Sequence, residues 1–118
     1  MNSSDQGTDG QEVILALSNA PDEGTARRIA RRLVDEQLVA CVNLLPSVHS
    51  IYRWQGKVEE ASECMMVIKT TRAVWPRLLE RLPELHPYDV PELIALDVQE
   101  GHGPYLAWVA ENVKEDGR

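Results

Sequence analysis

The residues of this chain that are best suited to chemistry lie in one short segment, residues 84–93, which reads ELHPYDVPEL. It carries an imidazole, His86, and a phenol, Tyr88, among closely spaced prolines. A residue that precedes proline is disfavoured in the helical region, so Pro87 and Pro91 predict a stiff, extended crossing. Such a crossing is either a connector that packs on the fold or a preordered wall of a polar pocket, and the residue types alone favour neither.

Two charged residues and one aromatic residue are candidates to join this segment in a ligand site. Lys69 ends the apolar run MMVIK, and Glu92 lies within the segment itself. A lysine in a small cleft binds an anion or a carbonyl group, whereas the alternative is an edge residue whose stem packs on the sheet. We predict that Lys69, His86, Tyr88, Glu92 and Trp54 line one cleft, which a neighbouring subunit's hairpin arm closes. An imidazole beside a lysine predicts a small anionic ligand.

The candidate metal ligands are three histidines, His49, His86 and His102, and two cysteines, Cys41 and Cys64. No two histidines have helical spacing, and none lies in a cysteine-rich cluster, so the chain has no zinc signature. A metal site would have to be assembled by the fold or across subunits. We predict no required cofactor and weak binding of Cu²⁺ or another divalent cation, with His86 and Cys41 as ligands. The alternative for Cys41 is a small buried residue.

Hydrophobic periodicity predicts the elements that must position these residues. Apolar or β-branched runs at Val13–Leu17, 39–54, 57–70 and Glu92–Val98 predict four strands. Spacings of three and four predict helices from Asp22 and from Arg72, and Gly103–Pro104 is typical of the start of a third helix. The order is βαββαβ with a C-terminal helix. It predicts an α+β, ferredoxin-like sandwich.

The two central strands form a long hairpin whose turn is predicted within WQGK, residues 54–57. Pro46 predicts a bulge or a bend in the first arm. If the turn centres on Gln55–Gly56, Cys64 faces about residue 47 and lies roughly 20 Å from Cys41. That separation excludes a disulfide between the two cysteines.

Two features of the pattern indicate an oligomer. The runs VILAL, MMVI and LIAL are apolar at every position, so both sheet faces are apolar although the two main helices cover only one. Hairpin arms of about 14–16 residues also span roughly 45–50 Å, longer than a compact domain of this size. A closed oligomer would bury the open face and support the projecting hairpin.

Length and charge limit the classes of partner. The 118 residues predict a polar, disordered tail at 1–11 and a single domain at 12–116. A net charge of −7 argues against nucleic acid and anionic membranes as partners. The chain shows neither the pattern of a signal peptide nor an apolar run of about 20 residues. We therefore expect a cytoplasmic protein that does not insert into membranes.

Four segments of the chain together form a specific pattern: ACVNLLPSVHSIYRWQGKVEE, IKTT, ELHPYDVPELIAL and YLAWV. This pattern resembles the CutA family of divalent-cation tolerance proteins, and the resemblance covers about residues 13–113. It implies a homotrimer of ferredoxin-like subunits, similar in architecture to the PII nitrogen-signalling proteins. It also implies a link to tolerance of copper and other divalent metals. The matching residues are Cys41, Asn43, Pro46, Tyr52, Trp54, Gly56, Lys57, Glu59, Lys69, His86, Pro87, Tyr88, Pro91 and Glu92.

One departure from the family concerns the metal. Some bacterial members proposed to bind copper carry a cysteine before an APD loop and two successive histidines before the PY pair. This chain has Ser18 and Leu85 at two of those three positions and keeps only His86.

Two functions from different classes remain open. The first is a non-enzymatic, trimeric binding and assembly protein, involved in metal tolerance, whose inter-subunit clefts bind a metal ion or a small ligand. The alternative is a small trimeric enzyme that uses His86, Tyr88 or Lys69 as acid and base. The chain has no nucleophile elbow, glycine-rich phosphate loop or metal triad, so we predict the first.

Overall fold

The computed structural model describes residues 12–114. The expected tail, 1–11, and the end of the expected domain, 115–116, lie outside the described residues. Four strands and three helices follow in the predicted order. They are β1 (Val13–Ala20), α2 (Glu23–Asp35), β2 (Cys41–Trp54), β3 (Lys57–Thr71), α3 (Trp75–Leu85), β4 (Ile94–Asp97) and α4 (Gly103–Glu111).

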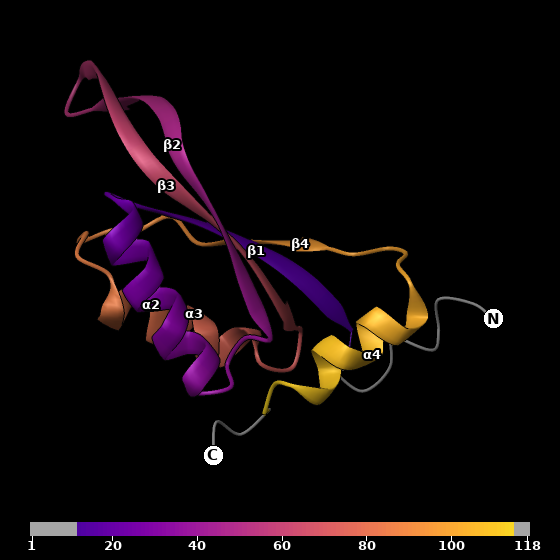
Figure 1. Ribbon diagram of the computed structural model, residues 1–118. Helices are drawn as coiled ribbons and strands as arrows, with labels where there is room; N and C mark the ends of the chain where they lie inside the picture. The colour runs from indigo at the N-terminus through magenta and orange to yellow at the C-terminus, as the bar shows by residue number, and fades with distance from the viewer. Residues whose placement is uncertain (1–11, 115–118) are drawn as a thin grey trace.

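The strands form one antiparallel sheet in the order β2-β3-β1-β4, with α2 and α3 together on one of its faces (Figure 1). The central strands β1 and β3 pair over the whole length of β1, from Val13 with Thr71 to Ala20 with Cys64. This arrangement confirms the predicted α+β, ferredoxin-like fold.

The core lies between the sheet and the two helices because both present apolar stripes to each other. Helix α2 is capped by the preceding residue, Asp22, whose carboxylate accepts a hydrogen bond from the Thr25 amide at 2.7 Å. Its inner face meets alternate residues of β1 and β3, as expected for a half-covered sheet. The fully buried members of this core include Ala16, Ile29, Leu33, Met66, Ile68, Leu78 and Leu82.

The β2–β3 hairpin projects well beyond the helices and gives the molecule its longest dimension of 49 Å (Figure 1). Its turn residues Gln55 and Gly56 both have positive φ, 51° and 82°, as a tight two-residue hairpin turn requires. The register shifts between Leu45 and Val48, so Pro46 marks a bulge as predicted. Both cysteines are free.

One element boundary differs from the prediction. Strand β4 is limited to Ile94–Asp97 instead of Glu92–Val98, because the Glu92 carbonyl accepts a hydrogen bond from the Ser18 hydroxyl. Helix α3 continues past Pro83 to Leu85, so this proline lies inside its last turn.

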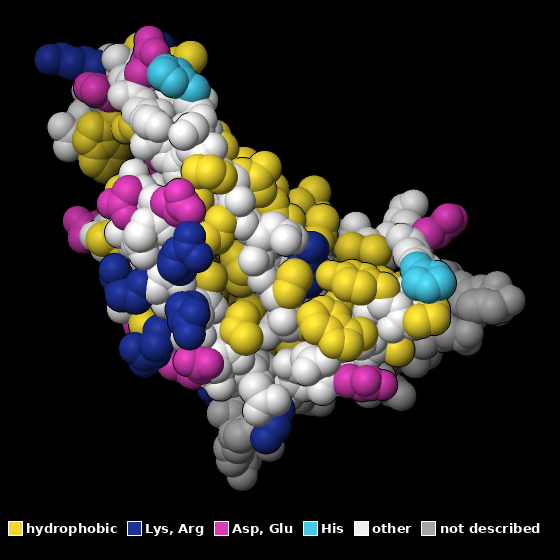
Figure 2. Space-filling model, in the orientation of Figure 1, with side chains coloured by type: hydrophobic (Ala, Val, Ile, Leu, Met, Phe, Trp, Pro, Cys, Tyr) yellow, Lys and Arg dark blue, Asp and Glu magenta, His cyan; other side chains and the backbone are white. Residues whose placement is uncertain are grey.

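The second face of the sheet is only partly covered. Helix α4 packs across one end of it, where Val109 is buried with Val13 and Ala40. Tyr105 and Trp108 of α4 are exposed, and their rings stack with centroids 5.7 Å apart. Figure 2 shows hydrophobic side chains gathered on the surface between the hairpin and α4. No helix in residues 12–114 is long and apolar enough to cross a membrane.

Candidate functional site

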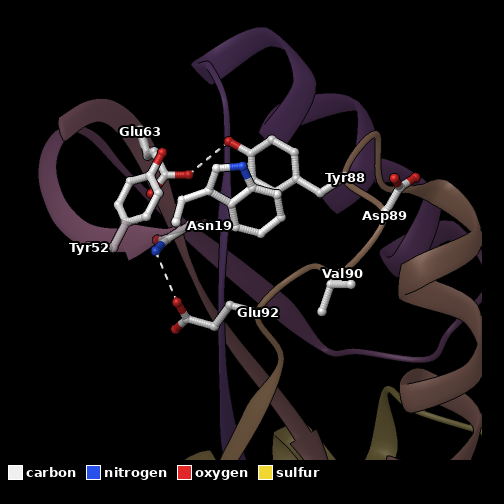
Figure 3. Close-up of a pocket in the computed structure, with 8 residues that line it drawn as sticks. Asn19, Tyr52, Glu63, Tyr88, Asp89, Val90 and Glu92 are labelled. Atoms are coloured by element: carbon white, nitrogen blue, oxygen red, sulfur yellow. Dashed lines mark hydrogen bonds between the residues drawn. The ribbon is translucent and has the colours of Figure 1, made fainter. Parts of the chain in front are cut away.

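A pocket of about 390 Å³ opens where the hairpin bends over the connection between α3 and β4 (Figure 3). Its walls come from the end of β1, the outer part of the hairpin and the Pro87–Glu92 segment. The lining residues are Asn19, Tyr52, Trp54, Glu63, Tyr88, Asp89, Val90 and Glu92.

The bulge in β2 determines which hairpin residues reach this pocket. In β3, Glu63 lies on the same side as Met65, because side chains alternate along a strand. The ladder pairs Met65 with Leu45 before the bulge and Glu63 with Val48 after it. The extra residue therefore reverses the alternation along β2. Odd-numbered β2 residues lie on the Glu63 side of the sheet before the bulge, and even-numbered ones lie on that side after it. Without it, Tyr52 and Trp54 would face away from the pocket.

Tyr88 connects the α3–β4 segment to the hairpin. Its hydroxyl donates a hydrogen bond to Glu63 Oε2 at 2.8 Å, and Figure 3 shows this hydroxyl pointing toward the carboxylate. Burial, and then the hydrogen bond and charge of Glu63, raise the pKa of Tyr88 to about 12. Tyr88 is therefore a neutral hydrogen-bond donor at physiological pH.

His86 ties the same segment to β1 instead of lining the pocket. The imidazole is only 7% exposed. Its Nδ1 accepts from the Tyr88 amide at 3.1 Å, so the proton is on Nε2, which donates to the Asn19 carbonyl at 2.7 Å. Both ring nitrogens are engaged by backbone, and neither has a lone pair free for a metal. The prediction of His86 as a metal ligand is therefore wrong for this geometry.

Glu92 is brought to the pocket by two further contacts with β1. The Asn19 side-chain amide donates to Glu92 Oε1 at 3.1 Å, and the Ser18 hydroxyl donates to the Glu92 carbonyl at 2.6 Å. Ser18, at the position where some members proposed to bind copper carry a cysteine, thus has a structural partner. The segment is both a connector and a pocket wall.

Lys69 does not share this pocket within one chain. Its ammonium group contacts Asn43 Oδ1 and lies 3.7 Å from the Cys41 thiol. It is six residues from Glu63 along β3, about 20 Å away. The prediction that Lys69 lines one cleft with His86 and Tyr88 is wrong for a single chain.

Cys41 lies at that same distant end of the sheet. It pairs with Lys69 across the ladder, and its sulfur is 4.0 Å from the Tyr105 hydroxyl. Burial and the neighbouring Cys41 raise the pKa of Tyr105. Cys41 and His86 are therefore not brought together. Residues 12–114 contain no group of three His, Cys, Asp or Glu side chains that could hold a metal ion.

Five of the eight residues that line the pocket were not singled out by sequence reasoning as ligand-binding. The residues that it missed are Asn19, Tyr52, Glu63, Asp89 and Val90. One of them, Tyr52, had a usable signal, because the bulge predicted at Pro46 reverses the facing of the β2 residues beyond it. Glu63 belongs to β3, and the others depend on how the α3–β4 segment folds against β1.

Comparison with known proteins identifies relatives of this chain. A family model described as CutA1 divalent ion tolerance protein matches residues 14–112. The divalent-cation tolerance protein CutA of Thermus thermophilus is 50% identical over 102 residues, which are 86% of this chain and 97% of that protein. Protein CutA of Mus musculus is 47% identical over 108 residues, 89% of this chain but only 61% of that longer protein.

The fold is shared as well. The crystal structure of CutA1 from Oryza sativa superposes with a TM-score of 0.87 at 35% identity, over 90% of this chain and 97% of that one. Family model, sequence relatives and solved structure agree over nearly all of the described residues. This chain belongs to the CutA1 divalent ion tolerance protein family.

Proposed function

We propose that the chain is a non-enzymatic, homotrimeric binding protein that takes part in divalent-cation tolerance, the role named for its bacterial relatives. The observation that supports the proposed trimer is the apolar, uncovered face of the sheet. Leu45, Ile94 and Leu96 are 43%, 50% and 46% exposed there, beside the half-buried Leu17 and Met65. A contiguous apolar surface of this kind is typical of a protein interface.

Further copies of the chain are the proposed cover. Helix α4 reaches only one end of the open face, and the family resemblance implies three subunits. Trp54, which is 57% exposed near the hairpin tip, is expected to pack at a subunit junction. Large exposed aromatic side chains are enriched at such junctions.

The divalent cation named for the family does not fit the side chains of one chain. His86 has no free nitrogen, and Cys41 lies at the other end of the sheet beside Lys69. A chelating site would need ligands from two or more subunits. No step of the proposed function therefore depends on a metal held by one subunit.

The enzyme alternative has less support. Tyr88 is a poor acid–base group near neutral pH because its pKa is raised to about 12. The His86 ring is committed to two backbone partners, and Lys69 lies far from both. A cytoplasmic location is part of the proposal, since the free thiols of Cys41 and Cys64 suit a reducing compartment.

Two measurements test the proposal. Sedimentation equilibrium at micromolar concentration should give three times the 13.3-kDa chain mass, and a folded monomer would contradict the assembly. Cells that lack the protein should grow more slowly than the parent in graded excess Cu²⁺ or Zn²⁺, and the wild-type gene should restore growth. Equal growth in every metal concentration would contradict the role in tolerance.

A further inference from the structure

We propose that the pocket bounded by Tyr52, Trp54, Glu63, Tyr88 and Glu92 binds a small organic cation, an ammonium group of an amine or quaternary amine. This inference goes beyond metal tolerance and does not rest on it. It starts from the composition of the walls, which combine aromatic rings with carboxylates around a hollow of about 390 Å³. That volume is in the range of small-molecule sites.

Among the described residues of one chain, the charge of the pocket is negative and uncompensated. Glu63, Asp89 and Glu92 line it, and its lining includes no lysine, arginine or histidine. None of these three carboxylates takes part in an ion pair found within residues 12–114. The small anionic ligand predicted from Lys69 and His86 therefore does not suit this pocket, whereas a cation does.

Neutral groups hold two of the carboxylates in place. The Tyr88 hydroxyl donates to Glu63, and the Asn19 amide donates to Glu92. Each contact orients a carboxylate without cancelling its charge, so the remaining oxygen lone pairs are available to a ligand. The Asn19 Oδ1 atom is a further acceptor, buried without a hydrogen-bond partner among the described residues.

The aromatic walls distinguish an organic cation from a metal ion. Rings of Tyr and Trp attract an ammonium group through their electron-rich faces, and such rings form the cages that recognise methylated ammonium groups. A divalent metal instead needs oxygens that converge to about 2.0–2.6 Å from one point. No such convergent group occurs in the described residues, so the carboxylates are spread around the hollow.

The test is isothermal titration of the full-length protein at constant ionic strength with three probes. Choline carries the quaternary cation, 3,3-dimethylbutan-1-ol is its neutral isostere, and glutarate is a small dianion. We expect saturable binding of choline, at least about tenfold tighter than the isostere, and no binding of glutarate. Equal affinity for the isostere, binding of glutarate, or no saturable binding of choline would overturn the inference.

Matched variants locate the site. Glu63→Gln should weaken choline binding at least about fivefold, and Asp89→Asn, in an exposed loop, should weaken it without risk to folding. Glu80→Gln removes a carboxylate from the exposed face of α3 and should change nothing. Unchanged affinity in both pocket variants overturns the assignment. A second outcome would also overturn it: Zn²⁺ displaces choline and binds less tightly to the Glu63→Gln variant than to the wild type. The pocket would then be a metal site.

Discussion

The two faces of the single sheet use the same strands in opposite ways. On the covered face, alternate residues such as Ala16, Met66 and Ile68 are fully buried beneath α2 and α3. On the open face, the residues in between remain accessible, and Ile94 and Leu96 are about half exposed. Both faces are apolar, so the difference lies in what the chain itself provides as a cover.

This difference shows which residues specify the fold of one subunit and which specify its association with other subunits. Burial on the covered face is complete within one subunit, so it stabilises the fold directly. The open face gains the same stabilisation only when another surface meets it. Its two ends are also chemically distinct, with Lys69 and Cys41 at the α4 end and the carboxylates of the pocket about 20 Å away.

The largest expected effect comes from the covered face. Leu78→Ala should lower the free energy of unfolding by about 2–5 kcal/mol, because it leaves a cavity among fully buried neighbours. Leu79→Ala, on the exposed side of the same helix, is the matched control and should cost far less. Denaturant unfolding at fixed protein concentration measures both. Equal losses in the two variants would show that α3 also packs by its outer face.

A charged substitution on the open face should weaken the association of subunits without unfolding the chain. Leu96→Arg places a charge on the apolar surface and is expected to weaken association at least about a hundredfold, roughly 3 kcal/mol. Far-ultraviolet circular dichroism should stay as in the wild type. Val34→Arg alters an exposed apolar residue of α2, away from the sheet, and should leave the sedimenting mass unchanged. An intact oligomer in Leu96→Arg would mean that subunits meet elsewhere.

The features predicted correctly from the sequence are those that local chemistry determines. The turn at Gln55–Gly56 follows from the residue types in WQGK, and the bulge follows from Pro46 in a strand. Element order follows from hydrophobic periodicity. The strands β1, β3 and β4 are apolar on both faces, which correctly predicted a face that the two main helices leave uncovered. Helix α4 covers one end of that face.

The candidate site was predicted less well because its geometry depends on long-range contacts. Lys69 and Tyr88 each have the right chemistry for a cleft, but strand register places them at opposite ends of the sheet. The role of His86 depends on two backbone groups, the carbonyl of Asn19 and the amide of Tyr88. No residue type in the sequence signals such backbone partners.

A smaller effect is expected at the His86 link between β1 and the α3–β4 segment. His86→Ala leaves the Asn19 carbonyl and the Tyr88 amide without their partner, which should cost about 1–3 kcal/mol of unfolding free energy. His102→Ala, at the exposed start of α4, should stay within about 0.5 kcal/mol of wild type. Thermal and denaturant unfolding measure both. No loss in His86→Ala would contradict its role as a link.

The smallest effect concerns the hydroxyl that holds Glu63. Tyr88→Phe removes one hydrogen bond at a partly exposed site, so it should cost about 0.5–1.5 kcal/mol. The phenol's pKa is raised to about 12 in the folded protein, so its proton is held more tightly there than in the unfolded chain. The contribution to stability is therefore complete below the ordinary tyrosine pKa of about 10 and is lost as pH rises through about 12.

Absorbance of the phenolate during an alkaline titration checks this assignment. Tyr88→Phe should remove a phenol that ionises near pH 12, whereas Tyr52→Phe should retain it. The Tyr105 phenol, whose pKa is also raised, stays in both variants and serves as an internal reference. If the phenol lost in Tyr88→Phe ionises near pH 10 instead, the Glu63 contact does not form in solution. Glu63 would then lack its neutral support, and the open face would carry a mobile carboxylate where the pocket requires a fixed one.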